Sequence, residues 1–374
     1  MTDFFLGCDG GGTKTDLVVV TGEGRLAACL RAPSTYYLSS DSRGPGLVGE
    51  VLGEAVPAVC SQAGIVPGDI RFAFFGLPGY GEVRADVPLL DAAAGQALGH
   101  GRFRCDNDML CGWAGSLAGA DGINVIAGTG SMTYGRRAGA GVRAGGWGEL
   151  FGDEGSGYWI GIRALRAFSK MSDGRAERGP LHDVLRRHLA LEADIDLVGV
   201  VLHQWRGARQ PIAALAPAVR EAALAGDRCA QAILADAAAE LTGLVDVTRR
   251  RLGFSPGEIV PVSYSGGIFA MPEVLDGFLA GIDALAASYR VSRPRYAPAI
   301  GAALYAAALG GTPLGDAALK ALPANLADPQ ADPRAEPHAD PRVDPRADPR
   351  ADPRADPRAD PRADPRADLR YPSV

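Results

Sequence analysis

The sequence predicts an α/β fold with two domains, and three observations support this prediction. The chain has 374 residues, apolar β-prone runs alternate with segments of helical spacing, and one type of hairpin occurs twice, about 120 residues apart. This length, with a hydrophobic content of 47%, is enough to bury two cores. We expect domains at 1–111 and 112–322, with the option that a closing helix at about 297–309 packs back on the first domain.

The composition argues against several classes of protein. The net charge of −6 gives no broad basic surface for nucleic acid. The chain has no apolar run of the roughly 20 residues that a membrane span needs, and the first residues lack the pattern of a signal peptide. The six cysteines are scattered, without a CxxC pair or zinc spacing. We therefore expect a cytoplasmic protein with reduced thiols and no nucleic-acid or membrane partner.

The first hairpin spans 4–20, where two apolar runs flank a turn rich in glycine. Glycines let the backbone approach a ligand, while threonine hydroxyls and a lysine ammonium suit phosphate oxygens. The candidate phosphate-binding residues are Gly10, Gly11, Gly12, Thr13, Lys14 and Thr15. Asp9, at the end of the first strand, is a candidate Mg²⁺ ligand, directly or through water. The motif is neither a P-loop nor a Rossmann fingerprint, because a strand follows where both need a helix.

The second hairpin spans 122–134 and repeats this architecture around a short polar turn. The turn consists of Gly128, Thr129, Gly130 and Ser131. Two such hairpins facing one another would hold a polyphosphate from both sides. Further along, a strand at 259–263 leads into a turn containing Gly266 and Gly267, where an adenine or ribose could lie flat on the backbone.

Two more segments carry polar residues where ligands commonly bind. Asp106, Asn107 and Asp108 follow a predicted strand at 101–105 and precede a predicted helix at 109–117. Helix capping explains one of the three, and a carboxylate held there could take a proton from a substrate hydroxyl. The segment 145–161, GGWGELFGDEGSGYWIG, combines acids with a glycine density typical of a backbone shaped around a ligand.

The remaining sequence is predicted to be scaffold and tail. The region 175–252 has helical spacing, with helices expected at 181–191, 195–205, 211–225 and 227–252, and its histidines lack metal-ligand spacing. A strand is also expected at 70–77 and a helix at 87–98. From Ala327 the chain becomes a four-residue repeat of the type ADPR, in which proline recurs every fourth residue. Proline prevents a regular helix and the repeat has no apolar surface to bury. We therefore predict a disordered tail at 327–374.

The motifs DGGGTKT, DND, GTGS, GGWG…GDEGS and SGGIF occur in a specific order. This order resembles the BadF/BadG/BcrA/BcrD-type ATPase family, and within it the N-acetylglucosamine and glucosamine kinases of the actin/hexokinase/Hsp70 superfamily. The resemblance covers about residues 4–310. It implies two ribonuclease-H-like, actin-like ATPase domains around a nucleotide cleft. It also implies ATP and Mg²⁺ as cofactors and phosphorylation of an amino sugar at its 6-hydroxyl.

The resemblance assigns a role to each motif. Residues 9–15 match the first phosphate loop, with Asp9 assisting Mg²⁺, and 128–131 match the second. Gly266 and Gly267 match the adenosine motif, and Asp108 matches the catalytic aspartate. The residues expected at the sugar are Tyr36, Asn107, Asp108, Gly146 and Asp153.

Departures from the family pattern lie at the sugar end. Tyr36 stands where the N-acetylglucosamine kinases typically carry asparagine, Met132 where they often carry a polar or small residue, and Pro78 where a small residue is usual. Glucosamine, N-acetylglucosamine, N-acetylmuramic acid and another hexose therefore all remain open as acceptors. The assembly, with a homodimer as one option, also remains open.

Two other functions compete with the kinase. One is the ATPase that activates 2-hydroxyacyl-CoA dehydratases, which holds an iron–sulfur cluster between subunits; Cys105 and Cys111 form the only close cysteine pair for it. The other is a non-catalytic nucleotide or sugar sensor, which would need to keep neither Asp9 nor Asp108.

Overall fold

The computed structural model describes residues 2–38, 44–255, 257–324 and 326. Its first sheet consists of β1 (Phe4–Gly10), β2 (Lys14–Thr21), β3 (Leu26–Pro33), β4 (Ile70–Leu77) and β5 (Phe103–Asn107). The strand order is β3-β2-β1-β4-β5. β1, β2 and β3 are antiparallel neighbours, whereas β4 and β5 run parallel to β1.

The second sheet repeats this connectivity. Its strands are β6 (Gly122–Ala127), β7 (Ser131–Arg137), β8 (Ala140–Gly145), β9 (Ile259–Ser265) and β10 (Ser288–Ser292), in the order β10-β9-β6-β7-β8. β6, β7 and β8 are antiparallel, and β9 and β10 run parallel to β6. The hairpins β1–β2 and β6–β7 therefore occupy equivalent places in their sheets, as expected from their similar sequences.

Most of the remaining described chain is helical. The α-helices of the first half are α1 (Gly46–Gln62), α2 (Val87–Leu98), α3 (Met109–Leu117), α4 (Gly157–Ser172), α5 (Pro180–His188) and α6 (Asp196–Val198). Those that follow are α7 (Arg209–Ala213), α8 (Ala216–Leu224), α9 (Arg228–Arg251), α10 (Pro272–Asp283), α11 (Pro298–Leu309) and α12 (Asp316–Ala321). Short 3₁₀ turns lie at Pro67–Asp69, Arg84–Asp86 and Gly267–Ala270, and a π-helical turn lies at Gly199–Gln204. None of the helices in the described part of the chain is long and apolar enough to cross a bilayer.

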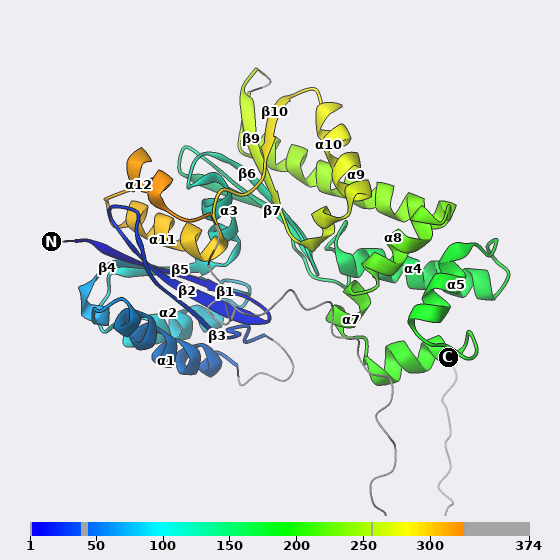
Figure 1. The fold of residues 1–374 in the computed structure, drawn as a ribbon, viewed down its shortest axis with the longest axis horizontal. Helices are drawn as coiled ribbons and strands as arrows, with labels where there is room; N and C mark the ends of the chain where they lie inside the picture. The colour runs from blue at the N-terminus through cyan, green and yellow to red at the C-terminus, as the bar shows by residue number, and fades with distance from the viewer. Residues whose placement is uncertain (1, 39–43, 256, 325, 327–374) are drawn as a thin grey trace, which may run out of the picture. The chain divides into compact units, whose positions relative to one another are not determined.

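Helices cover both faces of the first sheet. α1 and α2 lie on one face, and α3 and α11 lie on the other (Figure 1). α11 packs so closely on β1 that a Cβ at Gly7 would overlap the backbone of Ala299 and Ala303. Gly301 makes an equally close approach to α3 at Gly115. Small residues at these points let the helix backbone approach the strand directly, which fixes the position of β1 and of the hairpin that follows it.

The core around the second sheet is built by α4, α5, α8, α9 and α10. The long helix α9 contributes one apolar face, whose buried members are Ile233, Leu234, Ala237, Ala238, Leu241 and Val245. They recur at the three- and four-residue spacing of an amphipathic helix. The buried Phe254 and the strand residues Val260 and Val262 complete the same cluster. This core holds β6 and β9, whose ends carry the second hairpin and the Gly266–Gly267 turn.

The predicted α/β class and the two-sheet architecture agree with the structure. The expected strand at 70–77 and the helices at 87–98 and 109–117 have the predicted bounds. The single helix expected at 211–225 is wrong, because Pro217 begins a separate helix, α8, in its first turn. The helix expected at 195–205 is instead the short α6 followed by a π-helical turn. β8 and α12 were not predicted.

Two expectations of organisation stay predictions. The expected domain boundary between 111 and 112 falls inside α3, which contacts α11 as well as β6 and β9. The tail expected at 327–374 lies outside the described residues.

Candidate active site

The first hairpin places Asp9 at the end of a buried strand. Asp9 pairs directly with Asp16 across β1 and β2, so two acids share one face of the hairpin. Asp16 is balanced by Lys14 at 2.7 Å and by Arg31 at 2.9 Å. Lys14 remains about half exposed beside the glycine turn. The hairpin therefore presents the Asp9 carboxylate and a lysine ammonium close to Gly11, Gly12 and Thr13.

The segment after β3 supports this turn. The Ser34 hydroxyl donates to the Gly11 carbonyl at 2.7 Å and accepts from the backbone N–H of Tyr36 at 3.0 Å. Thr35 packs on Gly10, where a Cβ would overlap its hydroxyl, and the hydroxyl of Thr15 lies 3.2 Å away. Glycine at position 10 is thus required by close packing, and Tyr36 is brought to the side of the first hairpin.

Gly76 allows Asp108 to approach the end of β1. Gly76 lies on β4 between Asp9 of β1 and Asp106 of β5. A Cβ at this position would overlap the Cys111 sulfur and would lie 3.1 Å from the Cα of Asp108. Since no side chain separates them, the corner between β5 and α3 packs directly against the strand that carries Asp9.

Burial and nearby charges raise the pKa of both carboxyls. Burial, followed by the nearby Glu82, raises the pKa of Asp108 to about 6. Burial also raises the pKa of Asp9 well above its usual value, and the neighbouring Asp108 charge raises it further. Both carboxylates therefore gain from a nearby cation, and Asp108 has a pKa suited to a proton acceptor near neutral pH.

One of the three residues at 106–108 caps the helix, as expected, and it is Asn107. Asp106 and Asn107 belong to β5, and the side chain of Asp108 makes no capping hydrogen bond. The Asn107 side chain does so instead, accepting from the backbone N–H of Met109 at 3.2 Å. Asn107 is therefore explained by the geometry of the corner, and Asp108 is free of that structural task.

The second hairpin is bound to the segment that follows β8. The Gly157 N–H donates to the Gly128 carbonyl at 2.8 Å, and the Ser131 hydroxyl donates to the Glu154 carbonyl at 2.6 Å. Thr129 is exposed at the tip, with Gly128 and Gly130 partly exposed on either side. The strand contacts therefore hold the ends of the turn and leave its tip accessible.

The Gly266–Gly267 turn lies beside this hairpin. Ser265, at the end of β9, is paired with Ile126 near the end of β6. Gly266 has a positive φ of 103° and packs on the Ala127 carbonyl, where any side chain would overlap. Gly267 faces open space. The structure thus brings together the predicted second phosphate loop, which ends at Ser131, and the predicted adenosine motif, which begins at Gly266.

Asp153 is buried beside the second hairpin in an unusual backbone conformation. Its φ of 57° lies in the left-handed region, which is uncommon for a residue other than glycine. Its side chain is 2% exposed and forms an ion pair with Arg209. Hydrogen bonds from the backbone N–H groups of Ser131 and Gly148 also reach this carboxylate. Burial nevertheless raises its pKa, so these partners offset the penalty only in part.

Four charged residues near the site were not predicted. Glu82, in the loop after β4, forms an ion pair with Arg143 of β8 at 3.7 Å. Glu149 and Arg209 lie 3.7 Å apart, and both of their charges act on the pKa of Tyr36. Burial and Glu82 raise the pKa of Tyr36. Glu82, Arg143 and Arg209 come from separate elements and lie outside the predicted motifs, whereas Glu149 lies within the segment 145–161.

Gly146 lies at the entrance to the GGWG segment. It has a positive φ of 68°, and its carbonyl accepts a hydrogen bond from the Arg143 side chain. The same side chain donates to the Gly145 carbonyl at 3.1 Å. Arg143 therefore links this backbone to Glu82, and through it to the loop after β4.

The cysteines do not form an exposed cluster. Cys105 and Cys111 are both buried, and burial raises their pKa values. Among the described residues there is no group of three or more histidine, cysteine or acidic side chains able to hold a metal ion. This geometry gives no support to an iron–sulfur cluster shared between subunits.

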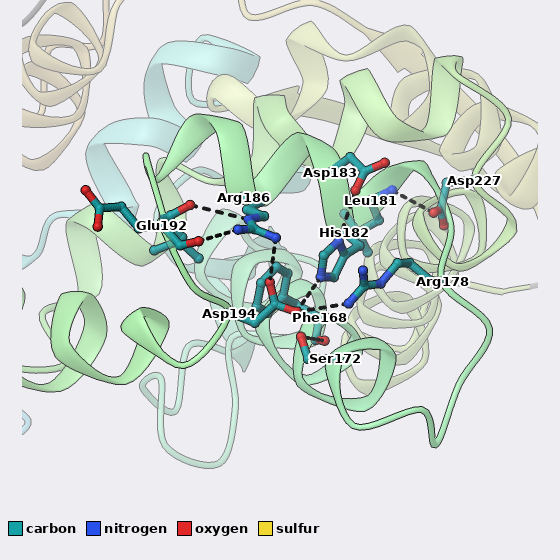
Figure 2. Close-up of polar contacts among 11 residues, drawn as sticks. Phe168, Ser172, Arg178, Leu181, His182, Asp183, Arg186, Glu192, Asp194 and Asp227 are labelled. Carbon is teal, nitrogen blue, oxygen red and sulfur yellow. Dashed lines mark hydrogen bonds and ion pairs between the residues drawn. The ribbon is translucent and has the colours of Figure 1, made fainter.

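The buried histidine of α5 belongs to the scaffold. His182 stacks on Phe168 with ring centroids 4.7 Å apart, and its ring nitrogens contact Asp183 and Asp194 at 3.1 and 2.8 Å (Figure 2). Asp194 also pairs with Arg178 at 3.0 Å. The network ties α4 to α5 and to the loop before α6, where it stabilises the helical region beside the second sheet.

The chain is similar to a known family of proteins and to characterised relatives. The family model described as "BadF/BadG/BcrA/BcrD ATPase family" matches residues 6–306. An N-acetyl-D-glucosamine kinase of Dictyostelium discoideum is 30% identical over 291 residues, which are 74% of this chain and 89% of that protein. An N-acetylmuramic acid/N-acetylglucosamine kinase of Clostridium acetobutylicum is 31% identical over 278 residues, again 74% and 89% of the two chains.

A solved structure gives the same result for the fold. The crystal structure of a protein assigned as an N-acetylglucosamine kinase from Chromobacterium violaceum superposes with a TM-score of 0.63 at 26% identity. The match covers 81% of this chain and 98% of that one. The predicted resemblance and the predicted two-domain actin-like fold are both confirmed.

Proposed function

Because the chain belongs to the BadF/BadG/BcrA/BcrD ATPase family, we propose that it is an ATP-dependent kinase of an amino sugar. In this proposal the γ-phosphoryl group of ATP passes to the 6-hydroxyl of N-acetylglucosamine or glucosamine, and Asp108 is the general base. The relatives described above act on N-acetylglucosamine, and one also on N-acetylmuramic acid, which supports an amino sugar as acceptor.

One observation carries the proposal: the corner that bears Asp108 packs against the end of β1, close enough for the Asp108 charge to raise the pKa of Asp9. Gly76 makes this closeness possible because it places nothing between β1 and the corner of α3. A group that accepts a proton from the attacking hydroxyl has to lie near the transferred phosphoryl group. A pKa of about 6 leaves Asp108 mostly ionised at neutral pH, while keeping it basic enough to accept that proton.

The two hairpins supply the other requirement of phosphoryl transfer, which is positioning. The reaction needs in-line placement of donor and acceptor and stabilisation of charge on the phosphoryl oxygens. Backbone N–H groups and hydroxyls at residues 10–15 and 128–131 can donate to those oxygens, and Lys14 adds a positive charge. The turn at Gly266 and Gly267, next to the second hairpin, leaves room for the nucleoside.

The carboxylates fit a Mg²⁺ ion. Asp16 has two cationic partners, whereas Asp9 faces Asp108 and has its pKa raised by that charge. Mg²⁺ prefers oxygen ligands and retains several waters, so one or two carboxylates together with substrate phosphates suffice. Asp9 would hold the ion, directly or through water. When bound, Mg²⁺ neutralises charge on the β- and γ-phosphate oxygens.

We assign the acceptor site to Tyr36, Asn107, Asp108, Gly146 and Asp153. Tyr36 and Asp153 share the neighbours Glu149 and Arg209, so they flank a common region. Tyr36 replaces an amide side chain by a phenol, which changes both the size and the hydrogen-bonding groups available to the sugar's 2-substituent. The identity of the preferred sugar is therefore the first question for experiment.

The test is a screen for ADP release with ATP and Mg²⁺ over N-acetylglucosamine, glucosamine, N-acetylmuramic acid, glucose and mannose. We expect ADP release that requires an amino sugar, with a product phosphorylated at position 6 by NMR. ADP release independent of all the sugars, or its absence with every sugar, would refute the kinase assignment. Tight binding of sugar or ATP without turnover would instead identify a sensor.

A further inference from the structure

A residue from the helical region contacts Asp153 and has no role in the motifs described so far. We propose that Arg209 is a positioning residue for the acceptor sugar, which fixes the Asp153 carboxylate toward the sugar hydroxyls and balances its charge. The inference rests on the proposed function, in which Asp153 contacts the sugar. It assigns the contribution of α7, a helix of five residues, to the acceptor site.

Arg209 reaches two acids and one hairpin at once. Its guanidinium forms an ion pair with Asp153 and lies 3.7 Å from Glu149. It also packs on the face of Gly130, at the second hairpin, where a Cβ would overlap it and would lie 2.7 Å from Asp153 Oδ2. Glycine at position 130 therefore leaves the space that the ion pair occupies.

The backbone of Asp153 shows why such a contact is needed. A left-handed conformation is unfavourable for a residue with a Cβ, and it persists where the surroundings determine it. Here the backbone N–H groups of Ser131 and Gly148 and the Arg209 guanidinium all converge on one carboxylate. A planar guanidinium fits a carboxylate in a defined orientation, so Arg209 specifies how the carboxylate is turned as well as where it lies.

Arg209 also retains a donor for a further group. Its Nε–H is buried and has no hydrogen-bond partner, because the Glu149 carboxylate is too distant at 3.7 Å. A buried donor without a partner is unfavourable, and a sugar hydroxyl or a water can satisfy it. The residue thus holds Asp153 while its Nε–H is left for a further acceptor.

Removal of Arg209 changes the charge balance around Asp153. The charged or titratable groups facing Asp153 are Arg209 from α7, Glu149 from its own segment and, through these two, Tyr158 of α4. Arg209 lowers the pKa of Asp153, whereas burial and Glu149 raise it. Without the guanidinium, burial and Glu149 raise the pKa of Asp153 further, so its carboxyl takes up a proton at higher pH. The protonated oxygen can then no longer accept a hydrogen bond from the sugar.

The experiment compares Arg209→Gln and Arg209→Lys with Arg220→Gln in the full chain. Arg220 is a matched control because its side chain is also 36% exposed and it also forms an ion pair, with Glu273 at 2.7 Å. The readouts are kcat, the KM values for N-acetylglucosamine and for ATP at pH 6.0, 7.0 and 8.5, and the apparent melting temperature. Sugar binding measured by calorimetry provides a readout that does not depend on turnover.

We expect Arg209→Gln to raise the sugar KM and the sugar dissociation constant about 10- to 100-fold at pH 7, with the ATP KM changed less than about threefold. The loss should be larger at pH 6.0 than at pH 8.5, and Arg209→Lys should restore part of it. Arg220→Gln should leave all kinetic values unchanged.

Three results would overturn the inference. They are an unchanged sugar KM in Arg209→Gln, an equal rise in the KM values for ATP and sugar, and a loss explained by unfolding at the assay temperature. The second would mean that Arg209 supports the hairpin at Gly130 rather than Asp153. If the wild-type protein phosphorylates none of the sugars, the proposed function fails first, and the binding measurement then decides whether Arg209 still supports sugar binding.

Discussion

Replacing Asp108 with asparagine removes a carboxylate whose ionisation the fold opposes. Its pKa rises from 3.8 to about 6 on folding, mainly because of burial and then because of Glu82. Between these two values the folded protein binds more protons than the unfolded chain, so stability falls as pH rises through this window. The cost to folding of burying the ionised Asp108 carboxylate is fully present above pH 6 and absent below pH 3.8.

The size of the effect follows from the shift. A difference of about 2 pKa units corresponds to at most about 3 kcal/mol at neutral pH, since one unit is worth 1.36 kcal/mol. Asp108 is partly exposed, so solvent screening reduces this electrostatic penalty. We therefore expect Asp108→Asn to raise the free energy of unfolding by about 1–2 kcal/mol at pH 7. The apparent melting temperature should rise by a few degrees. The gain should disappear by pH 4, where both proteins are uncharged at this position.

Activity should move in the opposite direction. Asparagine retains the shape of the side chain but accepts no proton, so kcat should fall by about 10²- to 10⁴-fold. The wild-type kcat/KM should fall in acid with an apparent pKa near 6, as Asp108 becomes protonated. The assays are thermal melts from pH 4 to pH 8 and ADP release with a saturating sugar. A variant that keeps full turnover would refute the base assignment, and one that is less stable than wild type at pH 7 would refute the electrostatic reasoning.

Three further outcomes test the structure. Gly76→Ala should destabilise the fold by about 1–3 kcal/mol and suppress ADP release, because the added Cβ overlaps the Cys111 sulfur. The control Gly53→Ala adds a Cβ in open space on α1 and should not lower the melting temperature. Asp194→Asn should lower the free energy of unfolding by about 2 kcal/mol in urea melts at pH 7. The loss should be smaller in acid, because the hydrogen bond with His182 is the chief cause of the lowered pKa of Asp194. The stability that the carboxylate provides disappears as pH falls through this lowered pKa. Truncation after Ala324 should leave ADP release unchanged; a large loss would show that the tail is required.

The sequence predicts the parts of the site that lie on local motifs. Each glycine hairpin combines a characteristic composition with flanking apolar strands, so its structure follows from neighbouring residues. Asp108 is also accessible to prediction, because it lies at a junction between a strand and a helix of clear periodicity. These features depend on local backbone geometry, which short stretches of sequence specify well.

The residues that were missed depend on contacts between distant segments. Arg209 meets Asp153 across a separation of 56 positions, and Glu82 meets Arg143 across different elements. Nothing in the sequence near these residues distinguishes them from other charged side chains on helices and loops. Gly76 was part of a recognised loop, but its steric role depends on the position of α3, which only the packed structure supplies.

The position of α11 has a consequence for the order in which the protein can assemble. The apolar face formed by Phe5, Val18, Val20 and Phe74 is covered by side chains of α11 and α3. Residue 7 therefore meets its packing partner at position 303, near the end of the described chain. During synthesis the first sheet can pair its strands and receive α1 and α2, but one of its faces stays in water until α11 has been made. The strand that leads into the first glycine hairpin is consequently packed late, although it is encoded first, and a fragment that ends at 111 should aggregate through this uncovered face.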